Sequence, residues 1–101
     1  MLGGALVPDH AVISADILAR YAEDAAREVA GLHALVPSQL HRHRGVRILD
    51  DGARVELHVA VEWGTHIPTL GGEVQQRVRE YLRSMASTEV AVDVVVDQVV
   101  P

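Results

Sequence analysis

The chain has 101 residues, a formal net charge of -5 and no cysteine. This length favours a single domain over residues 1–101 with one modest core. The lack of cysteine excludes disulfides, thiolate metal sites and a cysteine nucleophile. An acidic balance also argues against general binding to nucleic-acid phosphates. No apolar run reaches the roughly 20 residues of a membrane span, and the N-terminus lacks the basic region of a secretory signal. We therefore expect a cytoplasmic protein without direct membrane insertion.

The first third of the chain predicts one helix between less regular segments. Residues 1–11 contain a proline in a short apolar stretch and form either a loose N-terminal strand or a tail. Ser14 is a typical N-cap residue. Apolar residues then recur at helical spacing, which predicts a helix over residues 15–30 that Gly31 ends. The other face of this helix is charged and includes Glu23. Residues 32–45 are predicted to form a loop.

The next segment reads as a hairpin, because apolar and polar residues alternate on both sides of Asp51-Gly52. This dipeptide suits a two-residue turn with positive φ. The turn predicts four cross-strand pairs: Asp50 with Ala53, Ile48 with Val55, Arg47 with Glu56, and Val46 with Leu57. One face of the hairpin is apolar and includes Trp63, which we expect in the core.

A second helix is predicted to begin with Pro68 at its first helical position. Its apolar stripe consists of Leu70, Val74, Val78, Leu82 and Met85. Residues 90–96 then alternate as a final strand. The order is (β)αββαβ, an α+β fold with two helices packed on one face of a small three- to four-stranded sheet, antiparallel or mixed. The opposite, open face is predicted to carry Arg47, Glu56, His58, Ala60, Glu62, Asp93 and Asp97.

Short motifs follow one another in a specific order along about nine-tenths of the chain. They are Ile13-Ser14, Gly31, Gly45-Val46, Trp63-Gly64, Ile67-Pro68 and Val74-Gln75. In this order they resemble the alkaline shock protein family, the envelope stress response proteins of Gram-positive bacteria. The sequence departs from the family pattern at Ala86-Ser87-Thr88, where a Thr-Gly is usual, and in the loop over residues 32–44.

The resemblance implies a non-enzymatic cytoplasmic protein linked to cell-envelope homeostasis. It also implies self-association into a homo-oligomer and recruitment to the membrane periphery through a membrane-anchored protein partner. It implies no catalytic residue and no cofactor. The residues agree with this implication, because the sequence contains no nucleophile elbow, zinc-protease helix or phosphate-cradling glycine loop.

The run HRHRG at residues 41–45 carries the main alternative, a metal site. If the hairpin register continues past Gly45, His43 lies opposite Ala60 and His41 opposite Glu62. The candidate ligands on the open face would then be His41, His43, His58 and Glu62. These side chains are of types that Zn²⁺ accepts. The neighbouring arginines repel a dication, however, so a solvated loop is the competing interpretation. The same imidazoles would also respond to pH near neutrality.

Two surfaces are candidates for binding a partner. The first is basic and consists of Arg42, Arg44 and Arg47, which could contact an acidic protein or the phosphates of RNA. We do not favour the RNA interpretation, because the predicted open face is acidic and has no aromatic side chain on which a base could stack. The second consists of Val95, Val99 and Val100, which remain after the core-facing residues of the final strand have been assigned. They could pair with a second subunit or an envelope partner by strand addition.

Overall fold

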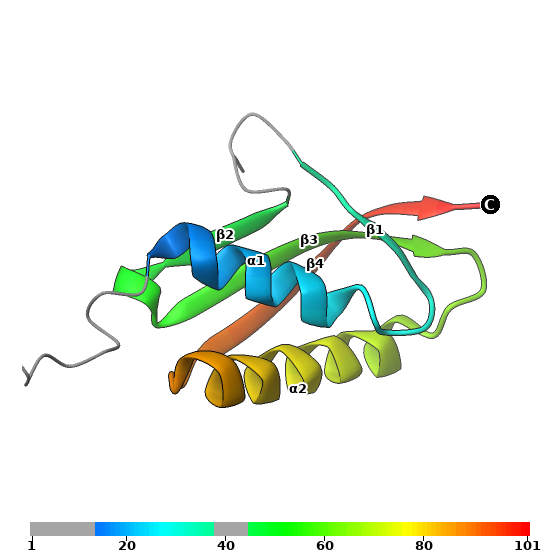
Figure 1. Cartoon of the computed structure of the whole chain (residues 1–101). Helices are drawn as coiled ribbons and strands as arrows, with labels where there is room; N and C mark the ends of the chain where they lie inside the picture. Colours follow the sequence, from blue (N-terminus) through cyan, green and yellow to red (C-terminus); the bar gives the residue numbers. More distant parts are fainter. Residues whose placement is uncertain (1–13, 38–44) are drawn as a thin grey trace, which may run out of the picture.

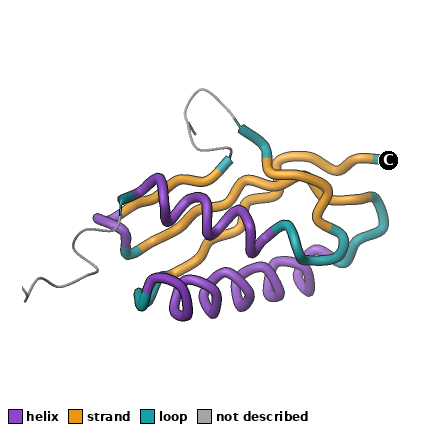
Figure 2. The backbone as a smooth tube through the Cα atoms, viewed as in Figure 1, coloured by secondary structure: helices purple, strands orange, loops and turns teal. Residues whose placement is uncertain are grey.

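The computed structural model describes residues 14–37 and 45–101, which form two helices on one face of a mixed four-stranded sheet (Figures 1 and 2). The elements are α1 (Ala15–Ala26), β1 (Leu32–Leu35), β2 (Val46–Leu49), η2 (Asp50–Gly52), β3 (Arg54–Glu62), α2 (Ile67–Ala86) and β4 (Ala91–Val100). The predicted α+β class and the placement of both helices are therefore confirmed. The N-terminal strand or tail predicted for residues 1–11 lies outside the described residues.

The long strand β3 is the centre of the sheet. On one side it pairs with β4 in parallel. On the other side it pairs antiparallel with β2 along its first half and with β1 along its second half. The prediction of a continuous loop over residues 32–45 was wrong at β1. The reason is that β2 has four residues and β3 has nine, so a second short segment is needed to satisfy the remaining edge of β3.

Gly45 is required where the chain re-enters the sheet. The Val36 N–H donates to the His58 carbonyl at 2.8 Å, and the His58 N–H donates to the Gly45 carbonyl at 2.8 Å. The chain therefore leaves the sheet after β1 and returns to it before β2 at the same residue of β3. Gly45 has φ +86°, and a Cβ on it would lie 2.8 Å from the Val36 nitrogen. Only glycine fits this position without displacing the neighbouring backbone.

The hairpin has the predicted register. The observed pairs are Val46 with Leu57, Arg47 with Glu56, Ile48 with Val55, and Leu49 with Arg54. Asp51 and Gly52 both have positive φ, as the turn requires, and the Ala53 N–H donates to the Asp50 carbonyl at 3.0 Å. Asp50 and Ala53 thus close the turn and are not a strand pair. Asp50 also has a positive φ of 53°, so η2 is a tight turn of left-handed residues.

Helix α1 starts as predicted and ends earlier than predicted. The Ser14 side chain accepts from the Ile17 N–H, which confirms the N-cap. The helix stops at Ala26 because the next hydrogen bonds tighten to three-residue spacing, including Val29 N–H to Ala26 C=O at 3.1 Å. Gly31, with φ +93°, then turns the chain into β1. Glu23, which was expected on the outer face, is only 3% exposed.

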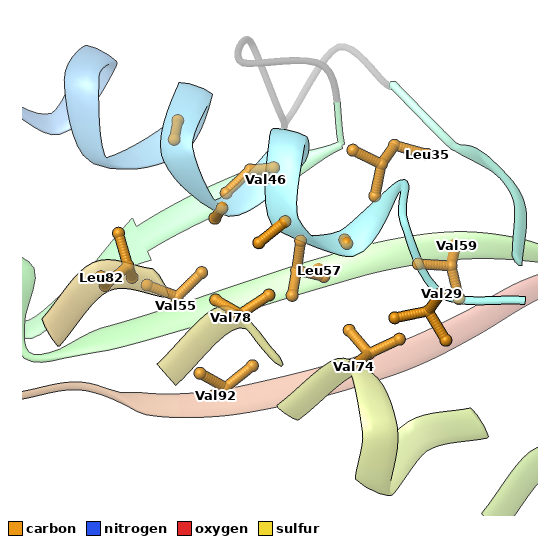
Figure 3. Packing of buried hydrophobic residues seen from close by; sticks show 14 of the residues in the cluster. Val29, Leu35, Val46, Val55, Leu57, Val59, Val74, Val78, Leu82 and Val92 are labelled. Carbon is orange, nitrogen blue, oxygen red and sulfur yellow. The ribbon is translucent and has the colours of Figure 1, made fainter. Parts of the chain in front are cut away.

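Both helices close over a core of aliphatic side chains from the sheet, as Figure 3 shows. Its largest fully buried members are Leu57, Leu70, Leu82, Val46, Val55, Val59, Val61, Val74 and Val78. Helix α2 begins at Ile67 with His66 as its N-cap, so Pro68 is the second helical residue. Met85 was expected in the buried stripe but is 50% exposed, and Ala86 is buried instead.

The expectation that Trp63 is a core residue was wrong, because its exposed fraction is 80%. Its position in the alternation of β3 would point it toward the helices. However, β3 ends one residue earlier at Glu62, and Gly64, with φ +88°, turns the chain away. Trp63 therefore lies beyond the part of the sheet that the helices cover.

We predict opposite effects for two Gly→Ala substitutions. Gly45→Ala should lower the free energy of unfolding by about 1–3 kcal/mol, because the positive φ and the Val36 backbone both oppose a Cβ. Gly72→Ala is the matched control and should raise it by up to about 1 kcal/mol, since the residue lies in α2 with no atom within 4 Å of the added methyl. Urea unfolding measures both changes. Equal effects of the two substitutions would contradict the tight Val36–Gly45 contact.

Candidate functional site

The open face of the sheet carries a connected set of charged side chains around His58. We call this set the open-face cluster, and it consists of Arg47, Arg54, Glu56, His58, Asp93 and Asp97. The Nε2 atom of His58 lies 2.8 Å from Glu56 Oε1, and its Nδ1 atom lies 3.0 Å from Asp97 Oδ2. The His58 side chain is 12% exposed, whereas the side chains of Glu56 and Asp97 are 20% and 36% exposed, so the contact with Asp97 is the more open of the two. The His58 ring therefore joins β3 to β4 on the open face.

The geometry around His58 favours the protonated ring. A neutral imidazole has one N–H, whereas two carboxylate oxygens can only accept, so the imidazolium alone donates to both. Burial lowers the pKa of His58, but the hydrogen bonds and negative charges of Glu56 and Asp97 outweigh it and raise the pKa above its usual 6.5. The hydrogen bond from His58 in turn lowers the pKa of Glu56, against an opposing effect of burial. His58 and Glu56 thus stabilise each other in their charged forms.

Arginines complete the open-face cluster on both sides of His58. Arg47 on β2 donates to Glu56 at 3.3 Å, as the hairpin register predicts. Arg54 donates to Asp93 on β4 at 2.8 Å. Their side chains are 43% and 42% exposed, so each pair contributes little more than a fraction of a kcal/mol. The arrangement links three strands and pairs side chains of opposite charge across the face.

The structure tests part of the predicted metal set. His41, His43, Arg42 and Arg44 lie outside the described residues, so their roles stay predictions. In the described part of the sheet, Ala34 of β1 lies opposite Ala60. Glu62 is exposed, and its N–H donates to the Gly31 carbonyl at 3.0 Å. Within residues 14–37 and 45–101, no three His, Asp or Glu side chains group as metal ligands. Ala60, expected on an open surface, is 2% exposed.

A second candidate surface lies at one end of the sheet, where β3 and β4 finish and α2 begins (Figure 1). Trp63, Ile67 and Val99 are 80%, 41% and 48% exposed, and they are three of the five large hydrophobic side chains exposed in the described part of the chain. We call these three residues the apolar end. The Trp63 N–H donates to the Val100 carbonyl at 2.7 Å, which holds the ends of the two strands together. The other predicted contact residues, Val95 and Val100, are half-buried.

Sequence reasoning missed two features of these surfaces. It placed His58 and Asp97 on one face, but it did not pair them, because their contact depends on the parallel register of β3 and β4 and on its irregularity between Val59 and Ala60. No local pattern reports a pairing across 39 residues. It also assigned Trp63 to the core. The glycine that follows Trp63 was the available signal that the strand ends there.

A family model for the alkaline shock proteins, described as having a cell envelope-related function, matches residues 8–101. The chain belongs to the alkaline shock protein family. The match covers nearly the whole chain and confirms the resemblance that the ordered motifs indicated. No curated protein and no solved structure matches the chain. In the described part of this alkaline shock protein family member, neither helix combines the length and the apolar character that crossing a bilayer requires.

We predict that His58 makes the stability of this family member depend on pH. Because its pKa is raised in the folded state, its contribution is fully present below the unfolded value near 6.5 and is lost as the pH rises through the folded value. Glu56 acts in the opposite direction, since its pKa is lowered from 4.5 and its contribution is lost only in acid below that value. Stability should therefore be greatest between the two unfolded values and decline on the alkaline side.

Urea unfolding from about pH 5 to about pH 9 measures this decline. His58→Gln should remove it and lower stability most at the acidic end of the range. His33→Gln is the control, because it removes an exposed histidine of β1 and leaves the Glu56–His58–Asp97 contacts intact. If His58→Gln kept the alkaline decline of the parent protein, the proposed imidazolium bridge would be wrong.

Proposed function

We propose that this protein is a non-enzymatic interaction protein of the cytoplasm that serves cell-envelope stress response and homeostasis. It acts through self-association and through a membrane-anchored protein partner. Membership of the alkaline shock protein family supports the link to the envelope. The single observation that carries an interaction role is the apolar end, where Trp63, Ile67 and Val99 are 80%, 41% and 48% exposed at the same end of the sheet. Grouped exposed apolar side chains are typical of surfaces that bind other proteins.

The character of the apolar end supports a protein as its occupant. Tryptophan is enriched among the residues that contribute most to protein interfaces, since it buries a large area and loses little conformational entropy. The formal net charge of -5 opposes direct adsorption to an anionic lipid surface. A membrane-anchored partner would bring the protein to the membrane without that electrostatic cost. Arg47, Arg42 and Arg44 remain candidates for a contact with an acidic part of such a partner.

A pH-responsive binding protein is the second candidate function, and the contacts of His58 favour it. Its ring bridges Glu56 and Asp97 on two adjacent strands at 2.8 and 3.0 Å. A change in its charge would alter the link between β3 and the last part of β4, which carries Val99. An RNA-binding role has less support, because Arg47 and Arg54 of the open-face cluster already pair with Glu56 and Asp93, and the cluster has no aromatic side chain on which a base could stack.

Substitution at the apolar end tests the interaction role. We expect Trp63→Ser to weaken capture of a membrane-anchored protein by about 30-fold, as for a central interface tryptophan. The melting temperature should change little, since the side chain is 80% exposed. Met85→Ser is the matched control at the opposite end of α2, where the methionine is 50% exposed. The measurement is quantitative recovery from the membrane fraction of native cells, with each purified full-length variant as bait.

Self-association is tested separately by sedimentation of the full chain over a wide concentration range. We expect the average mass to rise with concentration. A protein that stays monomeric throughout and recovers no membrane protein in the capture experiment would overturn the proposed function.

A further inference from the structure

The outer side of β4 has no strand partner among the described residues, since β4 pairs only with β3. The hydrogen bonds at the two ends of β4 show which of its backbone N–H and C=O groups point toward β3. The Ala91 N–H donates to the Ala53 carbonyl at 2.9 Å, and the Val100 carbonyl accepts from the Trp63 N–H at 2.7 Å, so both residues point toward β3. Successive residues of a strand direct their N–H and C=O groups to opposite sides. The residues that point outward are therefore Val92, Val94, Val96 and Val99.

Helix α2 covers only the beginning of this outer side. The Gln75 side chain donates from Nε2 to the Val92 carbonyl at 3.0 Å, which satisfies the first outward group. From Val94 onward, no described side chain bonds to the outward backbone groups of β4. We call Val94–Val99 the free edge. It spans about 20 Å, the length of a six-residue strand, which is sufficient to pair with an ordinary short strand.

The two faces beside the free edge differ in chemistry. On the helix side, Val94 and Val96 are half-buried and pack against the core cluster, so they present aliphatic surface. On the open side, Asp93 and Asp97 are 45% and 36% exposed at their side chains. An added strand would direct alternate side chains to these two faces. Aliphatic residues suit the first face, and basic residues suit the second.

Charge disfavours a second copy of β4 as the occupant. In an antiparallel pair, outward residues must face outward residues. The register that sets Val94 opposite Val94 of the other copy needs the Val92 carbonyl, which Gln75 already occupies. The register that avoids Val92 sets Val94 opposite Val96 of the other copy. That register sets Asp93 opposite Asp97 of the other copy, and the two-fold symmetry repeats this contact. Like charges placed directly opposite destabilise a strand pair. A partner segment with basic residues at these positions avoids the repulsion.

We infer that the free edge of β4 binds an extended segment of a partner protein in which apolar and basic residues alternate. The segment adds to the sheet as a further strand along Val94–Val99. This inference rests on the proposed interaction function and specifies how the partner docks. The main-chain hydrogen bonds supply affinity. Asp93 and Asp97 each already contact one cationic side chain, Arg54 and His58 respectively, but their side chains remain 45% and 36% exposed, so they favour basic over acidic side chains on the added strand. Gln75 marks the end of the docking site, because it already occupies the Val92 carbonyl.

Synthetic peptides test the inference with purified full-length protein. The probe is a hexapeptide of alternating valine and arginine, and the matched control replaces each arginine with glutamate. We expect the arginine peptide to bind at least about tenfold more tightly. On binding, the amides of Val94 and Val96 should gain protection from hydrogen exchange. The amides of Asp93 and Val95 point toward β3 and should change little.

Variants separate edge binding from general attraction. Val94→Pro removes an outward N–H, which edge strands tolerate, and should abolish binding. Should this variant not fold, Val99→Lys provides the second test, since the residue is 48% exposed and the added charge repels the arginine peptide. Ile17→Lys is its control. It adds the same charge at a 43% exposed residue near the start of α1 and should leave the affinity unchanged.

Several results would overturn the inference. These are equal affinity for both peptides, binding without protection of Val94 and Val96, or no binding at all. Protection of the same amides that grows with protein concentration in the absence of peptide would assign the free edge to a second copy. Faster exchange of these amides after deletion of residues 1–11 would assign it to the chain itself. None of these results depends on recovery of a cellular partner, so they leave the test of the proposed function intact.

Discussion

The structure depends on the hydrogen bonds that His58 makes in the middle of β3. Its carbonyl and N–H bind the two ends of the excursion between β1 and β2, at Val36 and Gly45. Its side chain contacts Asp97 on the opposite neighbouring strand at 3.0 Å. One residue of the central strand therefore joins all three of the other strands. Both candidate surfaces follow from this arrangement, because it determines where the edge segments meet β3 and how β4 lies beside it.

The two faces of the sheet satisfy different physical demands. The helix face is closed by aliphatic packing, and its largest side chains are almost fully buried. Tyr21 and Tyr81 also meet edge to face between the two helices, with ring centroids 5.8 Å apart. No described element covers the open face, and its charged residues pair with one another across strands. The surfaces that we propose for binding lie at the margins, at the apolar end and along the free edge of β4. These margins are where a small sheet leaves side chains and backbone groups without partners.

The family assignment and the structure support the same kind of role from independent directions. The family match concerns the cell envelope. The described surface has exposed apolar groups and a long edge strand, and its charged residues bind one another. These features suit a protein that acts by contact with other proteins. His58 adds a chemical property to that role, because its side-chain bridge between Glu56 and Asp97 depends on the protonation of the ring, whose pKa is raised.

Local signals in the sequence were sufficient for much of the fold. The Asp51-Gly52 turn determined the hairpin register to the residue, because a short turn leaves only one pairing. The Ser14 cap and the helical spacing located both helices, and the ordered motifs identified the family. These features depend on neighbours a few residues apart, so they can be inferred without a structure. The predictions for Met85 and for the end of α1 were wrong, because local periodicity does not show where a helix stops contacting the core.

The sequence alone thus determined the element types, the hairpin register and the family of this protein. Only the tertiary structure decided that β1 completes the edge of β3, that Trp63 is exposed, and that His58 meets Asp97. Each of these depends on contacts between segments far apart in the chain. Strand β1 forms because β3 extends beyond β2, Trp63 is exposed because the helices do not reach it, and the His58 contact requires the parallel register of β4. A four-residue strand has too little pattern to be recognised before the partner that requires it is in place.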